Sequence, residues 1–410
     1  MDWNNKVPKL LAGEELKNKL TDLPVYDDEV RSMDAATRLI QLTDLYKIYY
    51  PNMMSMEIYS RLYLAMMMSL KKKNTTLATL QQKENSLGMK NKEYRGIIGG
   101  SDSSTIIGCS GIGKSSAIAK AVELATGDKL IENTEPYMKI IPILQVQCPF
   151  DASPKGMLLE ILRMVDKHLE SSYYRSGTRT GVTTDTLIGL TSQVCLNHVG
   201  VLVIDEIQNV IKHRNGKLLV GVLMQLINCS GVSVVNVGTP ECISFFESET
   251  QLARRSIGLK YDVLPLDEYF VELCHLLFQY QYTRKKTEIT DVIINWLYEH
   301  SGGVIANVIS IIHDAQEIAI FNGTEIMNME NLNNAYDKRM GMLHAKIAAN
   351  MTKKASTMVK KKKGTGEIRT AGTIVNNFNI EDIIAGALGS KEDVVKVLRQ
   401  YIPVEEVAIQ

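Results

Sequence analysis

A glycine-rich segment of the chain has the residue types and spacing of a phosphate-binding loop. Residues 108–115 read Gly-Cys-Ser-Gly-Ile-Gly-Lys-Ser and fit the pattern G-x-x-x-x-G-K-[ST] between a predicted strand and a predicted helix. The glycines let consecutive backbone N–H groups point at a phosphate, and the helix beginning near Lys114 adds the positive end of its dipole. Lys114 is predicted to bind the β- and γ-phosphates of ATP, and Ser115 to bind Mg²⁺. The predicted nucleotide-binding residues are Gly108, Cys109, Ser110, Gly111, Ile112, Gly113, Lys114, Ser115, Ser116 and Asp205.

Two carboxylates follow a strongly apolar run further along the chain. The sequence Val-Leu-Val-Ile at 201–204 leads directly into Asp205 and Glu206. A buried strand would place Asp205 at the carboxyl edge of a sheet, beside the phosphate-binding loop. Asp205 is then predicted to hold Mg²⁺ together with Ser115, and Glu206 to orient and polarise the attacking water. An isolated match would also fit a strand followed by an acidic helix start, but its place after an intact loop favours hydrolysis.

Two later segments are predicted to complete the catalytic set. Thr239 ends another apolar strand in Val237-Gly238-Thr239-Pro240, which would bring its hydroxyl beside the γ-phosphate. Arg254 and Arg255 precede the fifth predicted strand and are candidates for an arginine finger, which reaches the γ-phosphate of a neighbouring subunit. A plain strand-ending turn and a surface arginine pair are the alternatives.

Short β-rich runs that alternate with helical stretches predict an α/β fold with a parallel sheet. The predicted strands are Ser104–Ile107, Lys139–Gln147, Val199–Ile204, Val232–Val237 and Leu259–Leu264. A complete strand and at least one helix separate Lys114 from Asp205, which favours the additional-strand class of P-loop ATPases that includes AAA+ proteins. We therefore expect an AAA+ P-loop ATPase fold with a helical lid and a helical N-terminal region.

The chain is too long for one ordinary domain, and its patterns change in three places. We predict an N-terminal helical region at 1–90, an α/β nucleotide-binding domain at 91–265 and a helical lid at 266–349. Residues 350–410 are predicted to be a basic linker with a C-terminal tail that docks a partner. Within the first region, Lys71-Lys72-Lys73 is predicted to be a solvated helix end, with a DNA contact as the alternative.

Composition does not indicate a partner, because 46 basic residues balance 46 acidic ones. The six cysteines show no metal-binding spacing and are expected to be reduced core thiols. The N-terminus lacks a cationic segment followed by an apolar one, and no run approaches the ~18 apolar residues of a membrane span. We expect a cytoplasmic protein with no membrane partner.

The order of these motifs resembles the TnsC/TniB family of AAA+ transposition regulators, whose relatives include the phage protein MuB. The resemblance covers roughly residues 90 to 345. Two segments look more like this family than like other AAA+ branches: Arg95-Gly96-Ile97-Ile98-Gly99-Gly100 and Val237-Gly238-Thr239-Pro240. Ala253-Arg254-Arg255 follows them in the same order as in the family.

The resemblance implies an ATP-dependent homo-oligomer, a ring or a helical filament, assembled on double-stranded DNA. Such a protein connects a target selector, either a protein or an RNA-guided complex, to the transposase subunits. It further implies DNA-backbone contacts at Lys155 and at Thr183 or Thr184, although a lysine in a Ser-Pro loop is usually just solvated. One position departs from the family: Asn307 stands where many members have a sensor-2 arginine, and asparagine cannot neutralise phosphate charge.

Two other functions remain open from the sequence. An AAA+ loader or remodeller acting on a protein partner, such as a helicase, would need an aromatic residue followed by glycine after the second strand. Phe150 is followed here by Asp151. A signalling NTPase would usually append a long repeat-built sensor, and no room for one remains after residue 345. Stimulation of hydrolysis by double-stranded DNA would separate these functions.

Overall fold

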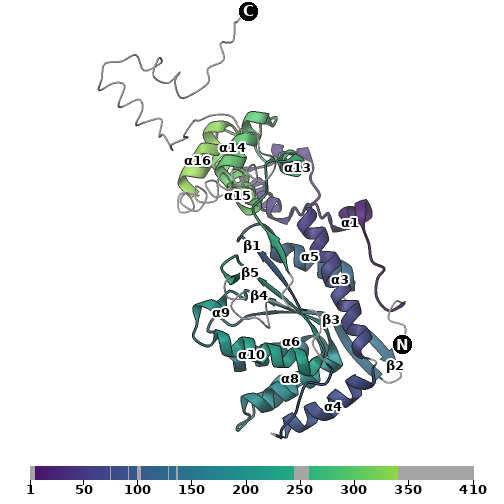
Figure 1. Cartoon of the computed structure of the whole chain (residues 1–410). Helices are drawn as coiled ribbons and strands as arrows, with labels where there is room; N and C mark the ends of the chain where they lie inside the picture. The colour runs from purple at the N-terminus through teal and green to yellow at the C-terminus, as the bar shows by residue number, and fades with distance from the viewer. Residues whose placement is uncertain are drawn as a thin grey trace, which may run out of the picture. The chain divides into compact units, whose positions relative to one another are not determined.

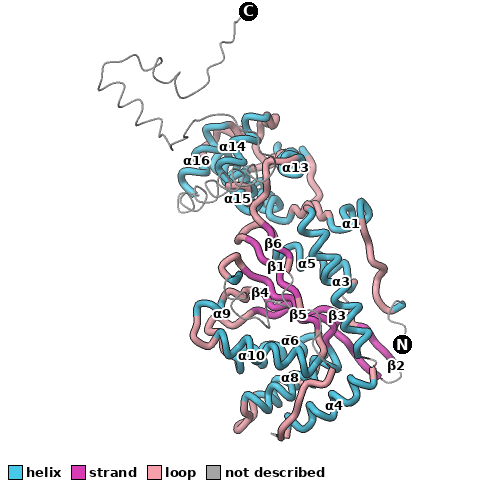
Figure 2. Tube along the Cα trace, in the orientation of Figure 1, coloured by secondary structure: helices cyan, strands magenta, loops and turns pink. Residues whose placement is uncertain are grey.

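The chain folds around a six-stranded sheet, which we describe from a computed structural model (Figures 1 and 2). The structure describes residues 5–73, 75–90, 92–98, 103–127, 129–134, 137–243 and 258–339. Two compact units divide the chain at residues 353 and 354, and the second unit lies outside the described residues. The strands are β1 (Ser104–Gly108), β2 (Ile131–Thr134), β3 (Tyr137–Gln147), β4 (Val199–Asp205), β5 (Ser233–Gly238) and β6 (Leu259–Tyr261).

The order of the strands is β2-β3-β4-β5-β1-β6, and only β2 runs antiparallel to its neighbour. Strand β5 lies between β1, which leads into the glycine-rich loop, and β4, which ends at Asp205. This inserted strand is the arrangement expected of an AAA+ P-loop protein, and the predicted fold class is confirmed. Because the four strands β1, β3, β4 and β5 are parallel, their carboxyl ends meet at one edge of the sheet.

The five predicted strands are all present, with two main differences. The polar strand β2 was not predicted, because its alternation is weak and it pairs only at the edge of the sheet. The last strand ends at Tyr261 rather than at Leu264. The N–H of Leu264 donates to the carbonyl of Gly303 at 2.9 Å, so the chain has already left the sheet for the lid.

Helices cover both faces of the sheet (Figure 1). Helices α3 (Met53–Lys73) and α5 (Lys114–Thr126) pack on one face, and α6 (Pro154–Leu169), α8 (Thr184–His198) and α10 (Gly216–Ser230) pack on the other. Every residue of β4 is buried between these layers. Fully burying an aliphatic side chain stabilises a fold by about 1.5–3 kcal/mol, so the sandwiched β4 holds Asp205 at a fixed depth.

Four helices form the lid between residues 258 and 339, and they share their core with the N-terminal part of the chain. The other helices are α1 (Gly13–Leu20), α2 (Ala35–Leu42), α4 (Thr76–Met89), α7 (Tyr173–Gly177), α9 (Asn209–Lys212), α13 (Glu268–Leu277), α14 (Asp291–Ser301), α15 (Ile305–Phe321) and α16 (Met329–Arg339). Leu42 and Leu45 are buried in the lid core, and Arg38 forms an ion pair with Glu325 at 2.7 Å. Helices α1 and α3 instead join the core on the face of the sheet that α5 covers. Residues 1–90, predicted as one helical region, therefore contribute to two cores.

The prediction for Lys71-Lys72-Lys73 is wrong for Lys73. Its side chain is buried, and its Nζ donates to the carbonyls of Cys195 at 2.9 Å and Leu196 at 2.6 Å. The last turn of α3 reaches the C-terminal end of α8, where the last carbonyl groups lack partners within the helix. The Cys195 carbonyl accepts both from Lys73 and from the N–H of the C-cap Val199. Lys73 therefore caps another helix, which sequence periodicity within α3 alone does not reveal.

This burial predicts a pH dependence of stability. Desolvation lowers the pKa of Lys73 from its ordinary value of 10.5 to about 7, while burial raises the pKa of the neighbouring Cys195 thiol to about 12 and keeps it neutral. Between pH 7 and 10.5 the unfolded chain binds one more proton at Lys73 than the folded chain, so the free energy of unfolding rises with pH there. Relative to Lys73→Met, the free energy of unfolding of the wild type should rise by at most about 1.4 kcal/mol per pH unit in this window and should not rise below it. Denaturant unfolding of both proteins from pH 6 to 10 measures this, and parallel pH profiles would contradict it.

Two general expectations can be compared with the structure. All six cysteines are free thiols, five of them buried. Within the described residues, no single helix is long and apolar enough to cross a membrane, and α14 and α15 pass such a test only as a pair bent by 118°.

Candidate nucleotide-binding site

The glycine-rich loop joins β1 to α5 and has the backbone conformation that phosphate binding requires. Gly111 and Gly113 adopt positive φ angles of 83° and 95°, which residues with a Cβ rarely do. Gly113 is also the N-cap of α5 and provides no side chain to the first turn. The N–H groups of that turn therefore remain for a ligand, as at other anion-binding helix N-termini.

A cavity of about 290 Å³ opens at this loop, at the carboxyl edge of the sheet. It brings together side chains and backbone from the loop, β4, β5 and the lid. The lining residues are Ser110, Gly111, Gly113, Lys114, Ser115, Ser116, Asp205, Glu206, Gln208, Gly238, Thr239 and Ala306. Three residues of the predicted set lie outside this lining: Ile112 is buried in the core, and Gly108 and Cys109 contribute carbonyl groups behind the loop.

Lys114 is the only cation among the described residues that line the cavity. Its Nζ donates to the carbonyls of Gly108 at 2.7 Å and Cys109 at 2.8 Å. Desolvation lowers the pKa of Lys114, and the nearby Asp205 carboxylate opposes this shift. The ammonium group is thus half-buried beside the loop, where phosphate oxygens would be stronger acceptors than the two neutral carbonyls.

Ser115 and Asp205 are directly bonded, because the Ser115 hydroxyl donates to the Asp205 carboxylate at 3.2 Å. Oxygen donors of this kind suit Mg²⁺, which binds through one or two protein groups together with substrate phosphates. Two buried oxygen atoms that line the same cavity, Thr239 Oγ1 and Gln208 Oε1, have no hydrogen-bond partner within the described part of the chain. The residues present therefore fit a magnesium-bound nucleotide.

Glu206 follows Asp205 in a strained conformation. Its φ angle is 58°, in the left-handed region that costs a non-glycine residue about 1–3 kcal/mol. The turn is fixed by its N–H, which donates to Asp205 Oδ1 at 2.8 Å, and its carboxylate accepts from the Gln208 side-chain amide. Glu206 is thereby aimed into the cavity from the end of β4.

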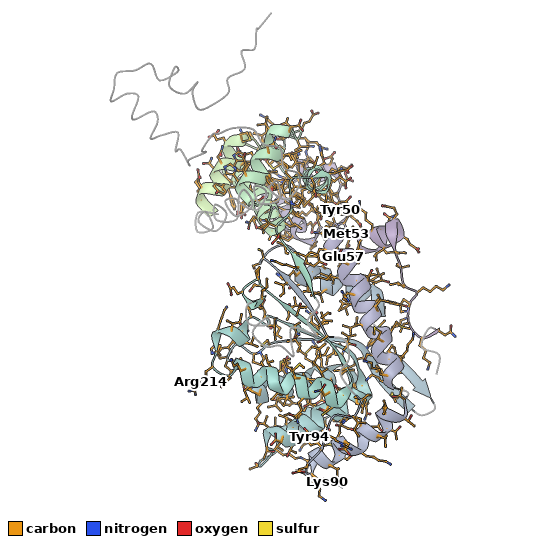
Figure 3. The ribbon with its side chains drawn as sticks, in the orientation of Figure 1. Tyr50, Met53, Glu57, Lys90, Tyr94 and Arg214 are labelled. Carbon is orange, nitrogen blue, oxygen red and sulfur yellow. The ribbon has the colours of Figure 1, made fainter. Side chains whose placement is uncertain are left out.

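A second cavity, of about 240 Å³, adjoins the first and was not predicted. The two share Gly111, Gly113, Ser116 and Ala306 in their linings. Tyrosines line the second cavity, including Tyr50, which is labelled in Figure 3. The ring of Tyr50 stacks on that of Tyr269, with centroids 5.5 Å apart. Flat apolar walls beside a phosphate site suit a nucleotide base. The sequence signal was the tyrosine-rich segment before Pro51, but only tertiary packing of this segment against the lid brings it to the loop.

The lid contacts the glycine-rich loop through backbone and small side chains. The Ala306 N–H donates to the Gly111 carbonyl at 3.1 Å, and a Cβ added to Gly111 would lie 2.8 Å from Val304 Cγ1. Asn307 instead donates from Nδ2 to the carbonyl of Ser301 at 3.0 Å, where it caps α14. Ala306, and not Asn307, lines the phosphate cavity, so this position of the lid provides no cation.

The residues predicted to contact DNA lie together, away from the nucleotide cavity. Lys155 is exposed in the first turn of α6, and its Nζ lies 3.4 Å from the carbonyl of Val182. Thr183 is the N-cap of α8, where its Oγ1 accepts from the Thr186 N–H at 3.2 Å, and Thr184 begins the helix. Capping alone would explain a threonine at 183. Arg254 and Arg255 lie outside the described residues.

Known proteins with similar sequences or folds were found in two of three comparisons. Residues 99–261 match the family described as Bacterial TniB protein, a shorter part than the resemblance noted from the motifs. None of the curated proteins matches the chain. Similar solved structures include the Aeropyrum pernix ORC1 protein in complex with DNA (15% identity, TM-score 0.41, 64% of this chain and 64% of that chain). The others are the Aeropyrum pernix ORC2 protein (17%, 0.38, 64% and 66%) and Drosophila ORC bound to DNA (13%, 0.43, 96% and 82%). This chain thus spans 64% of the length of the first of these structures.

Proposed function

Because residues 99–261 belong to the bacterial TniB family, we propose that this chain is an ATP-hydrolysing regulator of DNA transposition. In this proposal it assembles as a ring or filament on double-stranded DNA and links a target selector to the transposase. The observation that carries the proposal is a phosphate cavity whose lining residues, from Ser110 to Thr239, lie in the family-matched segment, with Ala306 of the lid as the one exception.

The lining residues divide the work of hydrolysis. Lys114 and the N–H groups of the loop hold the phosphates, and Ser115 and Asp205 would hold Mg²⁺, which neutralises phosphate charge. Glu206 orients and polarises the attacking water. The Thr239 hydroxyl, buried without a partner in the described part of the chain, would bond to the γ-phosphate or to that water.

Contact with DNA is supported by the position of Lys155 beside the Val182 carbonyl and the start of α8. A protein with no net charge can bind DNA tightly if each subunit of an oligomer adds a few phosphate contacts. Such contacts position the protein but carry little sequence preference. Binding would require ATP or a non-hydrolysable analogue, because a nucleotide between subunits stabilises the oligomer.

Lys155→Ala should reduce the salt dependence of duplex binding by about one ion per subunit, equally on every sequence. The measurement is a salt titration of duplex binding with and without a non-hydrolysable ATP analogue. Lys19→Ala is the matched control, because Lys19 is an exposed lysine on α1, packed on the opposite face of the sheet. Unchanged affinity and slope in Lys155→Ala would remove this residue from the DNA surface.

The alternative is an AAA+ remodeller that acts on a protein. One observation favours this alternative: Phe150 is 79% exposed just after β3, where such proteins carry an aromatic residue. Failure of the wild type to bind duplex under any nucleotide condition would move the choice to this alternative.

A further inference from the structure

The segment Ile211–Leu218, which we call the α9 loop, is an exposed basic element of the nucleotide-binding domain. It reads Ile-Lys-His-Arg-Asn-Gly-Lys-Leu, with three cations, one histidine and no carboxylate. Lys212, His213 and Arg214 are exposed, and Arg214 lies at the outer edge of the ribbon (Figure 3). Neither Lys212 nor Arg214 forms an ion pair with any residue that the structure describes.

This loop is held against the connection between β3 and α6. Asn209 donates from Nδ2 to the carbonyl of Cys148 at 3.1 Å, and Asn215 donates to the carbonyl of Asp151 at 3.5 Å. The rings of Phe150 and His213 meet edge to face, with centroids 6.3 Å apart. The backbone of the α9 loop is therefore held in place, while the side chains of Lys212 and Arg214 are exposed.

The same connection leads into Lys155, so the α9 loop extends the surface described above. Ser153 caps α6 by accepting from the Gly156 N–H at 3.1 Å, which places Lys155 in the first turn. The Lys155–Val182 and Phe150–His213 contacts thus connect three segments across one side of the domain: 182–184, 150–155 and 211–218.

Two carboxylates next to the α9 loop, those of Asp151 and Glu206, are engaged in local contacts. Asp151 Oδ1 accepts from the Ser153 N–H at 3.1 Å, and the Glu206 carboxylate accepts from Gln208. They are not paired with Lys212 or Arg214, so the surface presents cations toward an approaching ligand. A lysine and a planar guanidinium two residues apart suit the oxygens of neighbouring phosphates.

We propose that Lys212 and Arg214 of the α9 loop form a second contact with the DNA backbone, continuous with the contact at Lys155. This inference rests on the proposed function, because it takes duplex DNA as the polyanion. The α9 loop begins five residues after Glu206, so a phosphate bound by Lys212 or Arg214 would lie close in sequence to the catalytic carboxylate. DNA bound at the loop is therefore well placed to influence hydrolysis.

The test compares duplex binding by the wild type and by Lys212→Ala/Arg214→Ala, with a non-hydrolysable ATP analogue and a salt titration. The double variant should unfold at the wild-type temperature and should lower the salt slope by about 1.8 ions per subunit, at ~0.9 for each phosphate contact. Lys212→Arg/Arg214→Lys keeps both charges and should keep the wild-type slope. Lys9→Ala/Lys19→Ala, which removes two exposed charges before and within α1, is the matched control and should also keep it.

The outcomes separate the inference from the proposed function. If the wild type binds duplex and Lys155→Ala lowers the slope while Lys212→Ala/Arg214→Ala does not, the α9 loop is not a DNA contact and the inference alone fails. If the double variant instead fails to form oligomers in the absence of DNA, the loop contacts a neighbouring subunit and the inference is equally overturned. If the wild type does not bind duplex at all, the proposed function is wrong, and the inference that rests on it is wrong as well.

Discussion

Lys114→Ala is expected to abolish ATP binding, whereas Glu206→Gln is expected to leave binding intact and to stop turnover. Lys114 is the only cation among the described lining residues, so its loss removes charge-assisted bonds to the phosphates and should weaken binding at least ~100-fold. Glu206 enters the cavity from the end of β4, and its carboxyl group provides no positive charge to attract a phosphate. A general base contributes about 10²–10⁴-fold to rate, and Glu206→Gln should lose a factor of this size.

Nucleotide-binding titrations and steady-state hydrolysis separate the two effects. Lys120→Ala is a suitable control, because Lys120 lies on the same helix as Lys114 but pairs with Asp22 at 2.6 Å outside the cavity. This control should bind and hydrolyse ATP like the wild type. Hydrolysis by Glu206→Gln at the wild-type rate would refute the role assigned to the carboxylate.

The sheet and the phosphate cavity could be predicted because their signals are local. Val201 to Ile204 form a continuous apolar run, which is typical of a strand buried on both faces, and the loop pattern around Lys114 predicts where the nucleotide phosphates bind. Parallel pairing then places Asp205 and Thr239 at the same edge, without further information. The structure brings these residues into one cavity, while their catalytic roles stay predictions.

The features that were missed depend on contacts between distant segments. Lys73 looks like a solvated helix end from its neighbours in sequence, but its Nζ reaches carbonyl groups more than 120 residues away. The base-sized cavity needs Tyr50 from the N-terminal segment and Ile305 from the lid, and neither lies near the glycine-rich loop in sequence. Periodicity reports which face of a helix is buried but not which partner covers it.

The described part of the cavity provides little positive charge at the expected position of the γ-phosphate. In the described part of the cavity, Lys114 is the one cation, Ala306 is the lid residue present and Asn307 is engaged with Ser301. A transition state that spreads negative charge over the γ-phosphate oxygens needs more positive charge than Lys114 alone provides. Arg254 and Arg255, which precede the edge strand β6 in the chain, are the candidates for a finger from an adjacent subunit.

Arg254→Ala/Arg255→Ala should therefore lower hydrolysis by about 10³–10⁵-fold, as loss of an arginine finger does elsewhere, while ATP binding is retained. Mixing this protein with inactive Lys114→Ala protein should restore part of the activity. A subunit with intact Lys114 can then receive an intact finger from its neighbour, and in an equal random mixture about a quarter of head-to-tail interfaces pair the two. Steady-state hydrolysis across mixing ratios measures this recovery, which should be greatest near equal amounts. If mixtures hydrolyse no faster than either variant alone, or if wild-type hydrolysis per subunit is independent of concentration for a monomer, the arginines do not act between subunits.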